Sequence, residues 1–374
     1  MKVLRVISRL IVGITFMFSG FVKGVDPVGL SYKMTEYMEA YHLNWFIPAI
    51  LYLAIIMCMI EFAIGAALVF NLKPKIIQWL ALIMMGFFTV LTLLSAINNP
   101  VSDCGCFGDA IKLSNWETFY KNIVLLALVL VIIFTRNFSR PTLNYKWQIG
   151  LLVLVMLFPI GISVYSYNHL PLIDFLPWKV GNKISEQVVP TPEIAEVTLV
   201  YKDKKTGEKF EYTAKTLPYQ DSVKWNSIEF VEQKKKVVQP YKAAPVHDFN
   251  IIDENGVDQT ASIIANPGYQ FILVAHSLEE TNKKAFLEIN AFQRQCEKDS
   301  ISFVGLTGSG PSVVGDFRHE VQAMYPVYSM DETALKTMIR ANPGLILLKN
   351  GEVLAKWHYN DFPDYKKTKE KYLK

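Results

Sequence analysis

Long apolar stretches separated by short polar loops fill the first 167 residues of the chain. A helix of about 20 apolar residues can cross the roughly 30 Å hydrocarbon core of a bilayer. Five stretches are long enough, at about residues 3–22, 45–70, 76–97, 115–135 and 147–167. Ser114 stands three residues before Glu117, which predicts a capping box at the start of the fourth helix. The pattern predicts an all-α bundle that crosses a membrane five times.

The pattern changes after residue 167. Four prolines punctuate residues 168–195, so this part is expected to be extended. Residues 196–201 and 209–213 alternate apolar and polar positions on either side of a turn, which predicts a β-hairpin. Residues 227–238 predict a further strand.

Strands and helices alternate from residue 246 to the end. Strands are predicted at 249–253, 271–275, 301–306, 326–329, 344–348 and 353–358, and helices at 282–297, 313–324, 332–340 and from about 363. The dipeptide Asn350-Gly351 between the last two strands is the strongest short hairpin signal. The chain is therefore predicted to be multi-domain, with an α/β sandwich after the helix bundle.

Composition favours a membrane protein over a wholly soluble one. Mean hydropathy is +0.21 and 19% of the residues are charged, against about a quarter in ordinary soluble domains. These values exclude a disordered chain, a coiled coil and a collagen-like repeat. The lipid bilayer is the expected partner, and no stripe of Lys and Arg indicates nucleic acid. Four cysteines are too few and too scattered for a disulfide framework.

Basic residues in the loops predict how the bundle lies in the membrane. The loops and helix ends of one side carry basic residues and no acidic one: Lys2, Arg5, Arg9, Lys73, Lys75, Arg136, Arg140 and Lys146. We therefore expect a cytoplasmic N-terminus in a bacterial inner (cell) membrane, with everything after residue 167 in the periplasm. The first helix is expected to stay uncleaved, because no small-x-small cleavage site follows it.

The final segment, roughly residues 246–374, resembles the thioredoxin fold. Residues 341–353, Ala-Asn-Pro-Gly-Leu-Ile-Leu-Leu-Lys-Asn-Gly-Glu-Val, resemble the family's segment in which a cis-proline precedes a strand and a hairpin, and Pro343 would be that proline. The family places Cys-x-x-Cys after the strand here predicted at 271–275, but residues 276–282 contain no cysteine. Without a thiolate there, we expect this domain to bind a client protein rather than to exchange disulfides.

Residues 1–135 resemble DoxX-like and MauE-type membrane proteins. The resemblance rests on Phe18-Ser-Gly-Phe-Val-Lys23, on Glu61-Phe-Ala-Ile-Gly65 and, most specifically, on Asp103-Cys-Gly-Cys-Phe-Gly-Asp109. It implies a four-helix unit linked to quinone or sulfur redox chemistry, or to disulfide formation during the maturation of periplasmic enzymes. A quinone cofactor follows from this analogy alone, because the sequence shows no quinone motif.

Cys104 and Cys106 are the strongest candidates for chemistry. The predicted topology puts them on the oxidising side of the membrane, separated by the flexible Gly105. A disulfide across one residue closes a small, strained ring, and strained disulfides exchange readily. The alternative is a structural clip of the loop, or two thiols packed against the bundle. Cys58 and Cys296 are expected to be core residues.

Glu61 is the one ionisable residue within the second apolar stretch, and burying a carboxylate in a membrane calls for a partner. Counted from Trp45, Glu61 lies at a depth similar to that of Arg9 counted from Val22. Lys23, at the outer end of the first helix, is expected to be too far away and to anchor at the headgroups. We therefore expect a membrane-buried Arg9–Glu61 pair. It serves either as an ion pair that specifies the bundle or as part of a proton or quinone site.

Two functions of different classes fit these features. One is a redox or maturation component of the cell envelope, with thiol–disulfide chemistry at the external Cys-Gly-Cys loop and a periplasmic client held by the thioredoxin-like domain. The other is a non-enzymatic membrane scaffold whose exterior domain binds a partner and whose cysteines are structural. A transporter is weaker, since no repeat or pair of broken helices is visible. His276 is expected to be a polar loop residue, and no cluster at metal spacing predicts a metal site.

These features divide the chain into four parts. Residues 1–138 form a predicted four-helix transmembrane domain and residues 139–167 a fifth transmembrane helix. Residues 168–245 form a periplasmic linker with a small β-hairpin subdomain, and residues 246–374 a thioredoxin-like domain without active-site cysteines.

Overall fold

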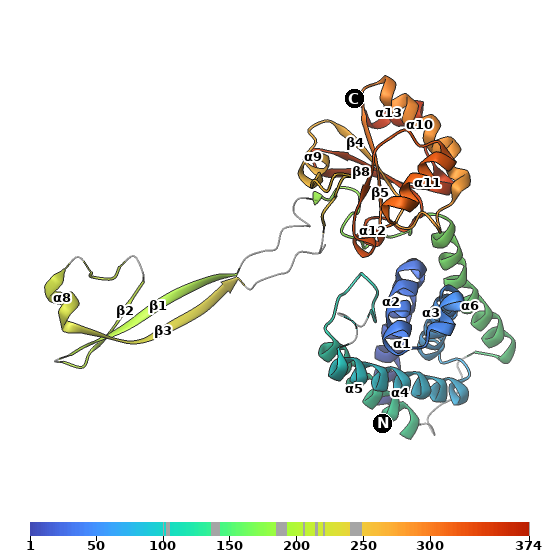
Figure 1. Ribbon diagram of the computed structural model, residues 1–374. Helices are drawn as coiled ribbons and strands as arrows, with labels where there is room; N and C mark the ends of the chain where they lie inside the picture. The colour runs from blue at the N-terminus through green and yellow to red at the C-terminus, as the bar shows by residue number, and fades with distance from the viewer. Residues whose placement is uncertain are drawn as a thin grey trace. The chain divides into compact units, whose positions relative to one another are not determined.

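The computed structural model describes residues 1–99, 101, 105–135, 143–184, 193–204, 206–213, 216–219, 221–239 and 249–373. Two compact units make up the chain (Figure 1). The larger unit contains Met1–Asn182 and Asn250–Lys374, so the helix bundle and the C-terminal sheet belong together. The smaller unit is Lys183–Phe249.

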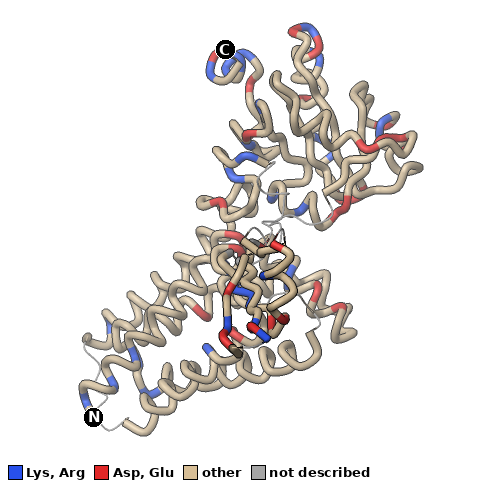
Figure 2. Tube along the Cα trace, turned by 90° about the vertical axis from the view of Figure 1, so that its left-hand side faces the viewer, with Lys and Arg blue, Asp and Glu red and all other residues tan. Residues whose placement is uncertain are grey.

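The helix bundle contains, among the described residues, five helices long and apolar enough to cross a membrane. They include α1 (Lys2–Val25), α3 (Ile50–Val69), α4 (Pro74–Asn98), α5 (Asn115–Phe134) and α6 (Tyr145–Asn168). Figure 2 shows these helices as long stretches with few charged residues. The five predicted spans are therefore confirmed. The predicted capping box is present as well, because Ser114 and Glu117 cap each other's backbone at the start of α5.

An additional helix, α2 (Pro27–Ala40), was not expected from the apolar pattern. The Asp26 side chain caps it by accepting a hydrogen bond of 2.8 Å from the backbone N–H of Gly29, and Pro27 occupies the first turn. Its residues are too polar for a membrane span. A short 3-10 helix, η1 (Asn44–Ala49), then leads into α3.

Glycines allow α1 and α3 to pack backbone against backbone. A Cβ atom on Gly20 would lie 2.7 Å from the backbone N of Phe62, and one on Gly65 would lie 2.6 Å from the backbone N of Met17. Both distances are too short for any real side chain. The antiparallel register of the two helices is therefore fixed, with Gly20 beside Phe62 and Gly13 beside Gly65.

The smaller unit is a sheet with the strand order β2-β1-β3. Its strands are β1 (Ile194–Asp203), β2 (Lys209–Tyr212) and β3 (Ile228–Gln239), and a short helix, α8 (Ser222–Ser227), precedes β3. β1 pairs antiparallel with both neighbours, which confirms the predicted hairpin and the added strand.

The C-terminal part of the larger unit is an α/β domain. Within residues 249–373, five strands form a sheet with the order β6-β5-β4-β7-β8. They are β4 (Tyr269–Val274), β5 (Ser302–Thr307), β6 (Val327–Ser329), β7 (Gly344–Lys349) and β8 (Glu352–His358). β4, β5 and β6 run parallel, whereas β7 and β8 form an antiparallel hairpin on the other side of β4.

The helices of this domain follow the predicted order and flank the sheet (Figure 1). They are α9 (Thr260–Ile264), η3 (Lys283–Ala285), α10 (Phe286–Lys298), α11 (Pro311–Val321), α12 (Glu332–Met338), η4 (Tyr359–Asp361) and α13 (Tyr365–Tyr372). The predicted fold class, a membrane helix bundle followed by a thioredoxin-like domain, is confirmed. The strand predicted at 249–253 is wrong, because Ile252 makes only isolated bridges there.

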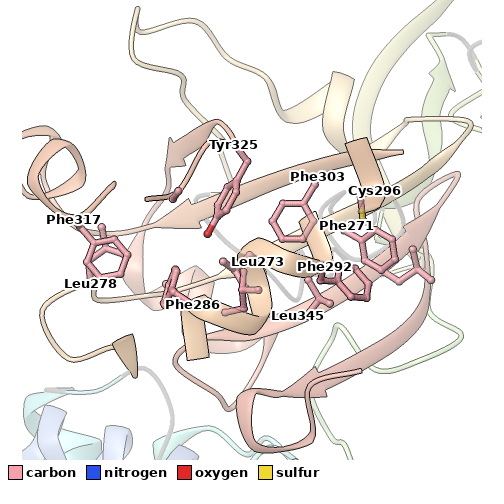
Figure 3. Close-up of a cluster of buried hydrophobic side chains, with 14 of the residues drawn as sticks. Phe271, Leu273, Leu278, Phe286, Phe292, Cys296, Phe303, Phe317, Tyr325 and Leu345 are labelled. Carbon is pink, nitrogen blue, oxygen red and sulfur yellow. The ribbon is translucent and has the colours of Figure 1, made fainter. Parts of the chain in front are cut away.

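The core of the thioredoxin-like domain forms where α10 packs on the central strands (Figure 3). Phe271 of β4 and Phe292 of α10 meet edge to face, with ring centroids 5.0 Å apart. Cys296 is completely buried in this cluster, and burial raises the pKa of its thiol to about 12. The prediction that Cys296 is a core residue is confirmed.

Candidate functional site

The Cys-Gly-Cys loop connects α4 to α5. Cys104 lies outside the described residues, so the geometry begins at Gly105. Gly105 and Gly108 have φ values of +61° and +53°, a left-handed conformation that favours glycine. The loop folds tightly, since the Gly108 N–H donates to the Gly105 carbonyl at 3.0 Å. The Ser19 hydroxyl of α1 donates to the Cys106 carbonyl at 2.6 Å, which fixes Cys106 to the bundle.

Glu61 is paired with Lys23, and the predicted Arg9–Glu61 pair is wrong. The Lys23 ammonium lies 2.8 Å from a Glu61 carboxylate oxygen, and each side chain is 4% exposed. Lys23 also lies 5.4 Å from the centroid of the Phe88 ring. A carboxylate buried among membrane helices thus has its counter-charge on the neighbouring helix.

The register of α1 and α3 explains this partner. Gly20 faces Phe62, so Glu61 stands at the level of Gly20, about one turn from Lys23 and about 16 Å along the helix from Arg9. Counting from Trp45 overestimates the depth of Glu61, because α3 begins only at Ile50, after η1. The long methylene stem of a lysine covers the remaining distance.

A small polar pocket lies between Cys106 and this ion pair. Its lining includes Ser19, Lys23, Glu61, Cys106 and Lys121, with aromatic walls from Phe88 and Phe107. Asn122 of α5 also lines it and donates to the Thr92 hydroxyl of α4 at 3.2 Å. Cys58, one turn before Glu61, is completely buried in the bundle, as predicted for a core residue.

The thioredoxin-like domain contacts the same end of the bundle through Arg340. Its guanidinium binds Asp26, at the junction of α1 and α2, and Asp109 of the Cys-Gly-Cys loop, each at 2.8 Å. A third bond joins it to the Lys336 carbonyl of α12. Burial alone would lower the pKa of Arg340, but the two carboxylates outweigh it and hold the pKa above its ordinary value. The guanidinium stays charged, and each of its three nitrogens donates a hydrogen bond.

Arg340 stands beside the proline loop of this domain. The Asn342–Pro343 peptide bond is cis, at the position that the resemblance indicated. The Asn342 side chain donates to the Ser277 carbonyl at 2.8 Å, which joins the proline loop to residues 276–282, the segment where a Cys-x-x-Cys motif would stand. The two segments together form one face, here called the proline face.

His276 belongs to the proline face and also contacts the bundle. Its ring Nε2 lies 3.3 Å from the Tyr32 hydroxyl of α2. Burial, together with the nearby Lys336 and Arg340, lowers the pKa of His276 to about 4 despite the opposing Glu332. The imidazole is therefore neutral at pH 7. His276 was expected to be an ordinary polar loop residue, whereas it is buried where the domain meets α2.

Sequence reasoning missed the charges that hold this site together. Lys23 was judged too distant, and Arg340 was not singled out because its partners lie more than 200 residues away. Asp109 stands in the sequence only as the end of the Cys-Gly-Cys motif, with no sign of its partner. The described residues contain no cluster of His, Cys, Asp and Glu that could hold a metal ion.

Comparison with known proteins gives matches in both halves of the chain. Residues 1–135 match the family model of the methylamine utilisation protein MauE. Protein TlpB of Flavobacterium psychrophilum is 23% identical over 218 residues, which are 56% of this chain and 59% of TlpB. The match thus spans less than two thirds of that relative's length.

Solved structures match about a third of the chain. A thiol-disulfide oxidoreductase from Bacteroides fragilis NCTC 9343 has 17% identity and a TM-score of 0.28, covering 33% of this chain and 98% of its own. StoA from Bacillus subtilis has 19% identity and a TM-score of 0.26, covering 33% and 93%. The fold itself rests on the strand order described above. The chain thus joins a membrane helix bundle, whose residues 1–135 are similar to the MauE family, to a thioredoxin-like domain.

Proposed function

We propose that this protein carries out thiol–disulfide exchange at Cys104 and Cys106, and that its thioredoxin-like domain binds the client protein. The bundle supplies the thiols, and the domain supplies the surface that holds a polypeptide beside them. The site faces the periplasm of a bacterial cell, because the basic loops lie at the opposite ends of the helices.

The observation that carries this proposal is the contact between the proline face and the Cys-Gly-Cys loop. Arg340, two residues before the Asn342–Pro343 bond, binds Asp109, three residues after Cys106. The thioredoxin-like domain has no cysteine on this face, since residues 276–282 contain none. The membrane loop therefore brings thiols to the face that lacks them.

One round of the proposed exchange needs either a client disulfide and the dithiol form of Cys104 and Cys106, or two client thiols and the disulfide form of the pair. In the reducing direction, one thiolate of the pair attacks a client disulfide, and a mixed disulfide forms while one client sulfur leaves as a thiolate. The second thiolate of the pair then attacks the mixed disulfide. The client leaves with two thiols, and Cys104 and Cys106 are joined by a disulfide. The oxidising direction runs the same steps in reverse.

Thiol trapping in living cells tests the proposal. Cells are quenched with acid and labelled with a mass-shifting maleimide, for the native chain and for Cys104→Ser and Cys106→Ser. We expect the native pair to change between dithiol and disulfide with growth conditions, and one of the two serine variants to accumulate mixed disulfides with clients. Cys296→Ser is the matched control, because this core thiol lies away from the loop. A pair locked in one state, with no mixed disulfide in either variant, would refute the proposal.

A scaffold without chemistry is the second candidate, and one observation favours it. The described part of the loop is tightly held by the Ser19 bond to Cys106 and by the turn from Gly105 to Gly108. A cysteine pair in such a loop can serve as a brace. A pair locked in one state in the trapping experiment, together with normal partner binding by Cys104→Ser and by Cys106→Ser, supports this function instead.

A further inference from the structure

Lysine side chains from three different helices lie around the described part of the Cys-Gly-Cys loop. Lys23 of α1 and Lys121 of α5 line the pocket that Cys106 also lines. The Lys121 ammonium lies 4.2 Å from the centroid of the Phe107 ring, next to Cys106. The Lys33 stem of α2 lies over Gly105, where its Cγ would be 3.0 Å from a Cβ atom added to that glycine.

Carboxylates neutralise two of these three lysines. Lys23 is paired with Glu61 at 2.8 Å, and Lys33 with Glu36 at 2.9 Å. Among the described residues, no carboxylate lies within ion-pair distance of Lys121. Of the other charged groups on this end of the bundle, Asp26 and Asp109 are both bound to Arg340. Within the part of the bundle that the structure describes, Lys121 is thus the lysine beside Cys106 that has no carboxylate at ion-pair distance.

Cys106 is placed to use this charge. The Ser19 hydroxyl donates to the backbone carbonyl of Cys106 and so fixes it. Cys106 also lines the same pocket as Lys23 and Lys121. Lys23 is also close enough to interact electrostatically with Cys106 and with Cys58. Cys58 is buried in an apolar cluster with Ala54 of α3 and Leu30 of α2, so Cys106 rather than Cys58 is the exchangeable sulfur.

We propose that Cys106 is the attacking thiolate of the pair, and that Lys121 stabilises the thiolate with a smaller contribution from Lys23. A thiolate rather than a thiol is the nucleophile, and a neighbouring ammonium favours it. Lys121 and Lys23 are positioning residues that act through Cys106. In the exchange, the Cys106 sulfur bonds to one client sulfur, and the other client sulfur leaves as a thiolate and takes a proton from water. The assignment rests on the proposed function.

Alkylation kinetics test the assignment without any client. The full-length Cys104→Ser protein in detergent micelles is reduced with a phosphine and treated with iodoacetamide at pH 7 and pH 10, and mass spectrometry follows the Cys106 peptide. Lys121→Met should slow alkylation at pH 7 by roughly tenfold, which corresponds to about 1.4 kcal/mol between the two protonation states. At pH 10 the rate should be unchanged, because the thiol is then ionised in both proteins.

Three further variants make the result specific. Lys121→Arg keeps the charge and should react like the parent protein at both pH values. Lys112→Met removes an exposed lysine of the same connection and is the matched control, with no expected change. Lys23→Met combined with Glu61→Gln removes both charges of the buried pair together and should slow the pH 7 reaction less than Lys121→Met, because the pair is neutral overall.

Two outcomes would overturn the assignment. An equal loss of rate at pH 7 and pH 10 in Lys121→Met would mean that the lysine controls access rather than charge. Faster alkylation at pH 7 of Cys104, measured in a Cys106→Ser protein, would make Cys104 the nucleophile. A pH-dependent Lys121 effect combined with the absence of mixed disulfides in cells would instead refute the proposed function and leave the charge assignment intact.

Discussion

At the scale of single residues, His276 of the thioredoxin-like domain makes a direct contact with the bundle. It is buried, and its ring contacts the Tyr32 hydroxyl, whose own pKa is raised chiefly by burial. The pKa of this imidazole is about 4 in the folded chain and about 6.5 in the unfolded chain. Between about pH 4 and pH 6.5 the unfolded chain therefore binds a proton at His276 that the folded chain does not bind. Native stability should therefore fall as the pH drops from about 6.5 toward 4.

Substitution of His276 tests this pH dependence. We expect His276→Gln to lose less stability than the native chain when thermal unfolding in micelles is compared at pH 7 and pH 5. His358, whose pKa burial also lowers to about 4, adds to the native pH dependence and remains in the variant. His319→Gln, at an exposed position of α11, is the control and should behave like the native chain. Equal acid sensitivity of all three proteins would contradict the argument.

The ion pair of Lys23 and Glu61 shows what residue-level reasoning could and could not predict. The need for a partner followed from Glu61 alone, since an isolated carboxylate in hydrocarbon is costly. The identity of the partner did not, because it depends on the register of two helices. Gly20, which packs on Phe62, and Gly65, which packs on Gly13, set that register, and nothing in the sequence indicates these two contacts.

At the scale of elements, the packing of α1 on α3 depends on these glycines. A methyl group on Gly65 would lie within 2.7 Å of backbone atoms of Met17 and Gly13, so the helices must move apart. We expect Gly65→Ala to lower the stability by about 1–3 kcal/mol, the usual cost of overpacking. Thermal unfolding in micelles measures this loss of stability. Moving the two helices apart should also separate Lys23 from Glu61.

Gly86 of α4 provides the matched control for this substitution. No atom lies within 4 Å of a Cβ added there, so Gly86→Ala should leave stability unchanged or raise it slightly through helix propensity. The same destabilisation in both variants would show that close packing at Gly65 is not the cause.

Most elements could be predicted because their signals are local. The length of the apolar stretches predicted the membrane helices, and Ser114 with Glu117 predicted the start of α5. Asn350-Gly351 predicted the final hairpin, and both residues adopt positive φ there. The helix α2 was missed because its cap, Asp26 before Pro27, precedes no amphipathic stripe that the pattern could detect. The domain boundaries at residues 138, 167 and 245 stay predictions.

At the scale of the whole molecule, Arg340 is the residue that binds the thioredoxin-like domain to the loop. Its side chain is 5% exposed and shared by Asp26 and Asp109. Removing one partner of such a buried cluster leaves carboxylates without their counter-charge, a loss of about 3 kcal/mol or more. We expect Arg340→Leu to increase hydrogen exchange at residues 105–111 and along α2.

An exposed pair supplies the control for Arg340. Lys283 and Glu320 form a surface ion pair at 2.8 Å, with both side chains about half exposed. Lys283→Met should change exchange near the loop very little, because such surface pairs contribute about 0–1 kcal/mol. Unaltered exchange in Arg340→Leu would show that the domain does not depend on this contact.

A contact between residues 26, 109 and 340 has no local signal in the sequence. Each of these residues is an ordinary surface type, and nothing in the hydrophobic pattern says which face of a soluble domain meets a bundle. The proline face was predictable from Pro343, and the loop from its two cysteines, but their juxtaposition required the fold.

The chain that leaves α6 stays attached to the thioredoxin-like domain. Asn360 binds the Asn168 carbonyl at 2.7 Å, His169 binds Asp361 at 2.7 Å, and the buried Lys356 binds Asp174 at 2.7 Å. If the Arg340 cluster opens, the domain should therefore pivot at the outer end of α6 rather than detach from the bundle. Opening on that one side would admit a polypeptide to Cys106 while the domain stays within reach to close again.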